Sequence, residues 1–259
     1  MVTILLAFSA ALGLVIGSFC NVVIYRLPRN ESLLYPGSRC PSCKAAIRWY
    51  HNVPVAGWLF LKGRCADCHA PISPRYPIVE AVLGALFLAC AWRFGLSWAT
   101  PVAWLFCSMV LCLALIDLER QLLLDRLTYP GIVLGLGASF LAPWTRPLDS
   151  VLGAIAGAAV PSLLIGLYAL RGIEAMGWGD VKLMAMIGAF LGWQGALLTL
   201  VGGSIIGIFA GGSWLLISRR SRATPLPFGT FLGAAAIGAL FFGEAAWSWY
   251  LGLFPGGLG

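Results

Sequence analysis

The sequence predicts an all-α membrane protein with about eight transmembrane helices and a small cytoplasmic loop that holds four cysteines. Hydrophobic residues form 60% of the 259 residues and charged residues only 10%, whereas roughly a quarter of a soluble domain is charged. The mean hydropathy is +0.89. A membrane span needs about 20 apolar residues, and uncharged runs cover residues 1–25, 94–116, 150–170, 183–218 and 223–243.

The basic residues predict the orientation of these spans. With eight spans, all of the 17 Lys and Arg residues except Arg93 and Arg146 fall in loops on one side. Positively charged loops stay in the cytoplasm, so both termini are expected outside. The net charge of +7 therefore reports orientation, and no nucleic-acid partner is expected.

Three regions are expected along the chain: a first span at residues 1–26, a cytoplasmic loop domain at 27–77 and a membrane core at 78–259. Residues 1–25 lack a basic leading segment and a cleavage site, so they are expected to form a permanent span and not a signal peptide. Asn21 near the end of this span is expected to hydrogen-bond between helices, with a substrate contact as the alternative.

The loop domain carries two C-x2-C pairs with 21 residues between them, formed by Cys40, Cys43, Cys65 and Cys68. Paired thiolates at such spacing form a tetrahedral four-sulfur site for a structural Zn²⁺. A reducing compartment disfavours disulfides, and a segment of about 50 residues with few large core residues needs the metal for order. The less favoured alternatives are His69 as a ligand and a redox role for either pair.

Several acids lie at the ends of the second and third spans. Glu80 begins the second span, where it either pairs locally or contacts a cationic part of a substrate. Glu119 and Asp125 each stand beside an Arg, which is typical of solvated charge. Asp117 instead follows the uncharged run 94–116. This position favours a desolvated and therefore perturbed carboxylate.

The turn Gly177-Trp178-Gly179-Asp180 brings a second carboxylate to the start of an apolar run. Only 36 uncharged residues separate Lys182 from Arg219, although the chain must cross twice there. The turn is therefore expected to begin below the membrane surface in a wet cavity, which places Asp180 inside the bundle. Gly177 and Gly179 are expected to admit an extended peptide and to adopt backbone angles closed to other residues.

Two aspartates about 3 Å apart cannot both ionise, so one holds a proton while the other acts as a base. Such a pair activates water against a carbonyl and returns a proton to the leaving nitrogen. One alternative is that Asp117 and Asp180 only pair with Arg120 or Lys182 at the interface. Another is a transporter that uses both acids, although the sequence shows no paired halves with broken helices.

Several motifs in one order resemble the type IV prepilin leader peptidases, which are also called prepilin peptidase/N-methyltransferases. They span nearly the whole chain: the segment 17–28 (GSFCNVVIYRLP), both C-x2-C pairs, Arg75-Tyr76-Pro77 with Glu80, Ile116-Asp117 with Asp125, and Gly177-x-Gly179-Asp180. The chain departs from the commoner family pattern at Cys20 and Leu124, where Leu and Pro are frequent.

The resemblance implies an intramembrane aspartyl endopeptidase of the bacterial inner membrane, with Asp117 and Asp180 as catalytic acids. Family substrates are type IV prepilins and type II secretion pseudopilins, whose basic leader is removed after a Gly at the cytoplasmic face. Members with the four-cysteine loop also methylate the new α-amine with S-adenosylmethionine. No soluble-type glycine loop for this donor is present, so methyl transfer rests on the resemblance alone.

A basic leader must approach a loop that is itself positive. Acidic residues near the cytoplasmic face are expected to receive it, namely Glu80, Glu119, Asp125 and Glu174. The sequence carries no signal for the oligomeric state, for the methyl-donor site or for a role of Asp125 in the chemistry.

Overall fold

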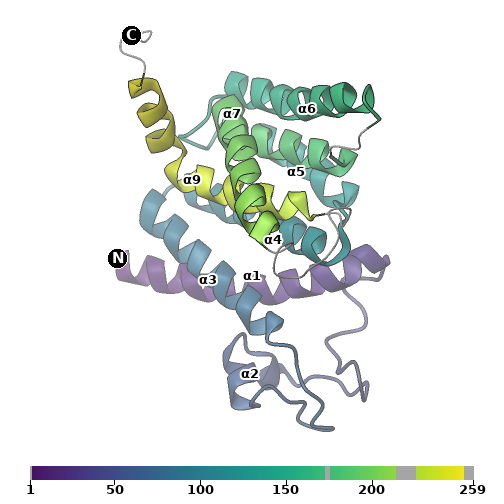
Figure 1. The fold of residues 1–259 in the computed structure, drawn as a ribbon. Coiled ribbons are helices and arrows are strands. Elements are labelled where there is room, and N and C mark those ends of the chain that lie inside the picture. Colours follow the sequence, from purple (N-terminus) through teal and green to yellow (C-terminus); the bar gives the residue numbers. More distant parts are fainter. Residues whose placement is uncertain (1, 173–175, 214–225, 254–259) are drawn as a thin grey trace. The chain divides into compact units, whose positions relative to one another are not determined.

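The computed structural model describes residues 2–172, 176–213 and 226–253. Within these ranges the chain is helical and contains no strand, only two isolated bridges in the loop domain (Figure 1). It divides into two compact units, residues 1–108 and 109–259. The predicted all-α membrane architecture is therefore confirmed. Packing joins the first span, the loop domain and the second span in one unit.

The first unit is built on the packing of α1 (Val2–Arg26) against α3 (Arg75–Phe94). Glycines on α1 allow the two backbones to approach closely: a Cβ at Gly17 would lie 2.7 Å from Glu80 Cα. The Asn21 side-chain amide donates to Tyr76 O at 3.1 Å, which is the interhelical hydrogen bond expected for this residue. The loop between the helices contains η1 (Leu27–Arg29), η2 (Trp49–Asn52) and α2 (Ala56–Phe60).

The second unit contains the end of α4 (Ala99–Arg120), then α5 (Asp125–Ala138) and α6 (Pro147–Ala169). These are followed by α7 (Trp178–Ile206), the π-helical turn η3 (Gly207–Gly211) and α9 (Phe228–Gly252). Helices α6 and α7 pack through small residues, because a Cβ at Gly153 or Gly188 would collide with the backbone of the other glycine. Helix α7 packs against α5, α6 and α9 in this unit (Figure 1).

A sharp bend at Gly192 divides α7 into two segments. Gly192 has φ 73° and ψ 177°, a backbone conformation that favours glycine. It lies beside the start of α6, where a Cβ would be 2.9 Å from Thr145 Oγ1. The predicted sixth and seventh spans are thus two parts of one bent helix. No connecting loop separates the two parts, which explains why the uncharged stretch between Lys182 and Arg219 is short for two spans.

Six of the described helices are long and apolar enough to cross a membrane: α1, α3, α4, α6, α7 and α9. The predicted fourth span is α5, which has 14 residues and a length of about 21 Å. This is shorter than a hydrocarbon core of about 30 Å. The count of about eight is reached only when α5 and both segments of α7 are included.

Candidate active site and metal centre

Asp117 lies at the end of α4 and is held by the first turn of α9. Its side chain is buried, with 6% of its surface exposed. The Thr230 amide donates to Asp117 Oδ2 at 2.8 Å. The Thr230 hydroxyl lies 3.2 Å from the same oxygen and 2.9 Å from Ala114 O, so its one hydrogen is shared between two acceptors. A carboxylate in the membrane region is therefore satisfied by groups 113 positions later in the chain.

The local sequence explains why α9 accepts this carboxylate. The helix begins after Pro227 and has no side-chain cap of its own, although the first amides of any helix lack partners within it. A negative group at this end is stabilised by those amides and by the helix dipole. Gly229 leaves room for it, since a Cβ there would lie 3.0 Å from Asp117 Oδ2.

Asp180 occupies the first turn of α7 and is also buried, with 8% exposed. Its Oδ2 accepts the Gly177 amide at 3.2 Å, and its own amide donates to Gly177 O at 3.1 Å. The two hydrogen bonds close the turn that precedes the helix. The prediction that the Gly-x-Gly-Asp turn carries Asp180 into the protein interior is confirmed by this burial.

The conformational role predicted for Gly177 and Gly179 is wrong. Gly177 has φ −79° and ψ 148°, which any residue adopts, and neither glycine is among the described residues with positive φ. Gly179 is instead needed for close packing, because a Cβ there would lie 2.9 Å from Leu123 Cβ. A Cβ at Gly177 would meet Asp180 Oδ2 at an ordinary 3.5 Å.

Leu123 connects the surroundings of the two aspartates. It belongs to the extended segment between α4 and α5, and its side chain contacts both Gly179 and Gly229. The Asp117 and Asp180 carboxylates interact electrostatically. The hydrogen bonds that they accept come from backbone and hydroxyl groups, not from Arg120 or Lys182. The structure thus brings both predicted acids into one buried site.

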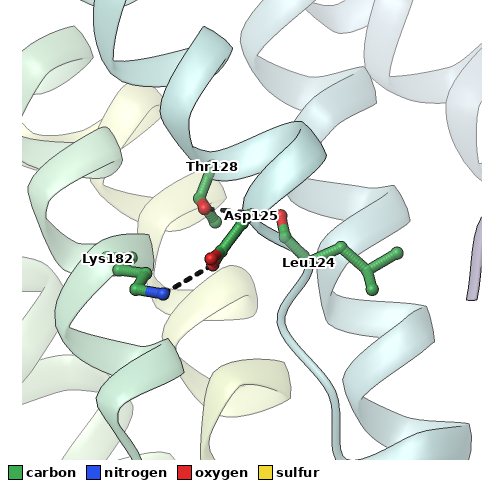
Figure 2. A network of polar contacts seen from close by, with 4 residues as sticks. All are labelled: Leu124, Asp125, Thr128 and Lys182. Carbon is green, nitrogen blue, oxygen red and sulfur yellow. Dashed lines mark hydrogen bonds and ion pairs between the residues drawn. The ribbon is translucent and has the colours of Figure 1, made fainter.

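Lys182 pairs with Asp125 beside this site. Its Nζ lies 2.6 Å from Asp125 Oδ1, and the side chains are 30% and 53% exposed (Figure 2). Thr128 donates its hydroxyl to Leu124 O in the same turn. An exposed pair of this kind contributes at most about 1 kcal/mol. Asp125 therefore carries solvated charge, as predicted, but its partner comes from α7 and not from the adjacent Arg126.

The other candidate acids have separate surroundings. Glu80 is buried, with 7% exposed, and its Oε2 accepts the Val55 amide at 2.7 Å. Glu119 is exposed at the end of α4. Glu174 lies outside the described residues, as do Arg219, Arg220 and Arg222, which contributed to the predicted orientation.

The four cysteines of the loop domain form one compact cluster. The sulfur atoms of Cys40, Cys43, Cys65 and Cys68 all lie within 4.8 Å of one another, and those of Cys40 and Cys68 are 3.7 Å apart. A tetrahedron with Zn–S bonds of about 2.3 Å has sulfurs about 3.8 Å apart. The donor set and spacing therefore fit a zinc ion.

Both C-x2-C pairs have the same backbone construction. Cys40 N donates to Ala45 O and Cys65 N donates to Ala70 O, each at 2.9 Å. The residue after the second cysteine has positive φ in both, 61° at Lys44 and 56° at His69. His69 is thus the exposed counterpart of Lys44 in its turn and not a fourth ligand.

Backbone amides also prepare one thiol for metal binding. Hydrogen bonds from the amides of Cys43 and then Ser42 lower the pKa of Cys40 to about 6. This sulfur is therefore largely a thiolate near neutral pH, and the thiolate is the form that binds metal.

Thr230 is the contributor that the sequence analysis missed. It is uncharged, and the only local signal is its position two residues after Phe228, where a helix starts directly after Pro227. Its role depends on a contact across more than 100 residues, which spacing and composition do not reveal.

Comparison with known proteins gives consistent matches over most of the chain. Residues 11–94 match the bacterial peptidase A24 N-terminal domain, and residues 104–212 match the type IV leader peptidase family. The chain is 38% identical to the prepilin leader peptidase/N-methyltransferase of Aeromonas hydrophila, over 92% of this chain and 91% of that protein. It is 37% identical to proteins of the same name from Stutzerimonas stutzeri, over 93% and 91%, and Burkholderia pseudomallei, over 92% and 85%. No solved structure matches the chain.

Proposed function

Because this chain belongs to the type IV leader peptidase family, we propose that it is a membrane-embedded prepilin peptidase that also methylates the new N-terminus. Its substrates are type IV prepilins and type II secretion pseudopilins, cut after the glycine that ends their basic leader. The observation that supports the peptidase proposal is that Asp117 and Asp180 are both buried, interact electrostatically and have Leu123 packed beside the glycines next to them.

The two carboxylates act as a pair that shares one proton. The ionised member takes a proton from water as the water oxygen attacks the carbonyl carbon of the scissile bond. The protonated member donates to the carbonyl oxygen, and a proton then passes to the leaving nitrogen as the C–N bond breaks. This chemistry needs a desolvated site, which the burial of both side chains supplies.

The protein sits in the bacterial inner membrane with its loop domain and its aspartates at the cytoplasmic side. The support is the distribution of the 17 basic residues: with eight spans, only Arg93 and Arg146 fall on the opposite side. The substrate enters sideways from the lipid because its own apolar segment is a membrane helix.

The loop domain holds a structural Zn²⁺ through Cys40, Cys43, Cys65 and Cys68. The ion supplies cross-links to a segment without a large core of its own, and it takes no part in the cleavage. S-adenosylmethionine supplies the methyl group, as the name of the similar proteins implies.

The test of the proposed function is incubation of the purified enzyme with a synthetic prepilin, with and without S-adenosylmethionine. We expect loss of the leader in both reactions, and the added mass of one methyl group only with the donor. Mass spectrometry of the mature N-terminus measures both results. An intact prepilin with folded enzyme would refute the peptidase proposal, and an unmethylated product with the donor present would refute the transferase.

We also propose that Glu80 positions the loop domain, because its buried carboxylate accepts the Val55 amide. In Glu80→Ala this amide loses its acceptor, at a cost of about 1–3 kcal/mol. We expect proteolysis of the loop to accelerate roughly 5- to 150-fold, whereas Glu80→Gln retains an acceptor oxygen and most of the protection.

Glu31→Ala is the matched control, because Glu31 is an exposed acid of the same loop. The Glu80 variants also separate positioning from leader recognition. If Glu80 binds the leader, Glu80→Ala slows cleavage of a basic-leader prepilin but not of a neutral-leader one, while loop proteolysis stays at the wild-type rate.

A further inference from the structure

We propose that Asp117 is the ionised member of the aspartate pair, that Asp180 carries the proton, and that Thr230 is the positioning residue that fixes this distribution. The inference rests on the proposed peptidase function and deepens it. It follows from the different sets of donors around the two carboxylates.

Asp117 receives donors from the first turn of a long helix. The Thr230 amide points at Oδ2 from 2.8 Å, and the Thr230 hydroxyl shares its hydrogen with the same oxygen at 3.2 Å. Gly229 adjoins the same oxygen, since a Cβ there would lie 3.0 Å from Asp117 Oδ2. Hydrogen bonds to a carboxylate favour its charged form, and the dipole of the 25-residue helix α9 acts in the same direction.

Asp180 has a poorer set of donors. Its one hydrogen bond from the described part of the chain is the Gly177 amide at 3.2 Å, which is longer than the bond from Thr230 to Asp117. Both side chains are almost equally buried, at 6% and 8% exposed. Desolvation therefore does not separate them, and the donors decide which carboxylate holds the negative charge.

The charged groups on the surrounding helices do not reverse this preference. On α7, the nearest cation in the chain to Asp180 is Lys182, which pairs with Asp125 of α5. Helix α9 carries only Glu244, four turns beyond Thr230. On α4, Glu119 and Arg120 are exposed beyond the buried Asp117, and Arg126 on α5 is exposed.

With Asp117 ionised and Asp180 protonated, each aspartate has a defined role in the two steps of cleavage. Asp117 takes the proton from the attacking water as the new C–O bond forms, while Asp180 gives its proton to the carbonyl oxygen. Asp117 then passes its proton to the leaving nitrogen as the C–N bond breaks, and a hydroxyl of the intermediate returns a proton to Asp180. Both acids end in their starting states, so no further reactant is required.

The test is the pH profile of kcat/KM for prepilin cleavage in Thr230 variants. Thr230→Val removes the hydroxyl and keeps the amide, so the ionised form of Asp117 loses one of the groups that stabilise it. We expect the acidic limb to move upward by about 0.5–1 pH unit while the alkaline limb stays in place. Thr230→Ser restores the wild-type profile. Thr230→Pro, which also removes the amide, moves the limb further.

Thr199→Val provides the matched control, because Thr199 is a fully buried threonine of α7 whose hydroxyl has no hydrogen-bond partner among the described residues. A Thr230→Val enzyme that loses rate equally at every pH would overturn the inference, since that is a merely structural effect. A shift confined to the alkaline limb would reverse the assignment. Failure of the proposed function is a different result, namely an Asp117→Asn enzyme that still cleaves.

Discussion

Asp117→Asn and Asp180→Asn are each expected to lower prepilin cleavage on the order of 10⁴-fold, because an amide neither accepts the proton of water nor donates an acidic one. Asparagine has nearly the shape of aspartate and keeps an oxygen that accepts the Thr230 or Gly177 amide. The fold should therefore survive. The measurement is the cleavage rate of a synthetic prepilin by purified enzyme, with the melting temperature recorded for each variant.

Asp125→Asn is the control for this result. Asp125 lies beside the same site, but it is half exposed and paired with Lys182. Loss of such a pair costs at most about 1 kcal/mol, so we expect less than about tenfold loss of rate. If Asp125→Asn lowered the cleavage rate as much as Asp117→Asn and Asp180→Asn do, the rate would depend on negative charge near the site and not on the dyad. Full activity in Asp180→Asn would refute the dyad.

Removal of zinc from the loop domain is expected to unfold it locally. Structural zinc sites contribute apparent binding free energies of about 10–16 kcal/mol, and buried hydrophobic residues between 27 and 74 are confined to two of the ligands, Cys40 and Cys65. Cys40→Ala should therefore abolish zinc binding and expose the loop to protease. Metal analysis of the purified protein and limited proteolysis measure the two effects.

Cys90→Ala serves as the comparison, because Cys90 is a buried cysteine of α3 outside the cluster. It should keep the full zinc content. Chelation of the wild-type protein should reproduce the Cys40→Ala cleavage pattern, and added zinc should reverse it. A Cys40→Ala protein with undiminished zinc would show that the ion is bound elsewhere.

The helical membrane architecture was predictable because length and hydropathy are local properties of the chain. Uncharged runs mark the helices, and the sequence spacing of cysteines marks the cluster. The bend at Gly192 was not predictable in this way, since its backbone conformation is set by packing beside Thr145 and Asp149. The length of α5 was not predictable either, because its limits at Asp125 and Ala138 depend on packing against neighbouring helices.

The charged residues of the site were predictable from the sequence, but its uncharged residues were not. Asp117 and Asp180 stand out because a carboxylate beside an apolar run is costly, whereas Thr230 has no charge to mark it. The prediction for Gly177 and Gly179 failed for a related reason. The conformational freedom of glycine can be inferred from the residue type alone. The requirement for a residue without a side chain at position 179 instead comes from packing against Leu123, which lies in a different segment.

The hydrogen bond from Thr230 to Asp117 also sets an order of events during synthesis. Both aspartates leave the ribosome long before residue 230 does, since chains are made from the N-terminus. A nascent or truncated chain that stops before α9 carries the two acids but lacks the groups that hold Asp117 in place. We therefore expect prepilin cleavage to begin only once α9 has inserted, because Thr230 on that helix supplies the donors to Asp117.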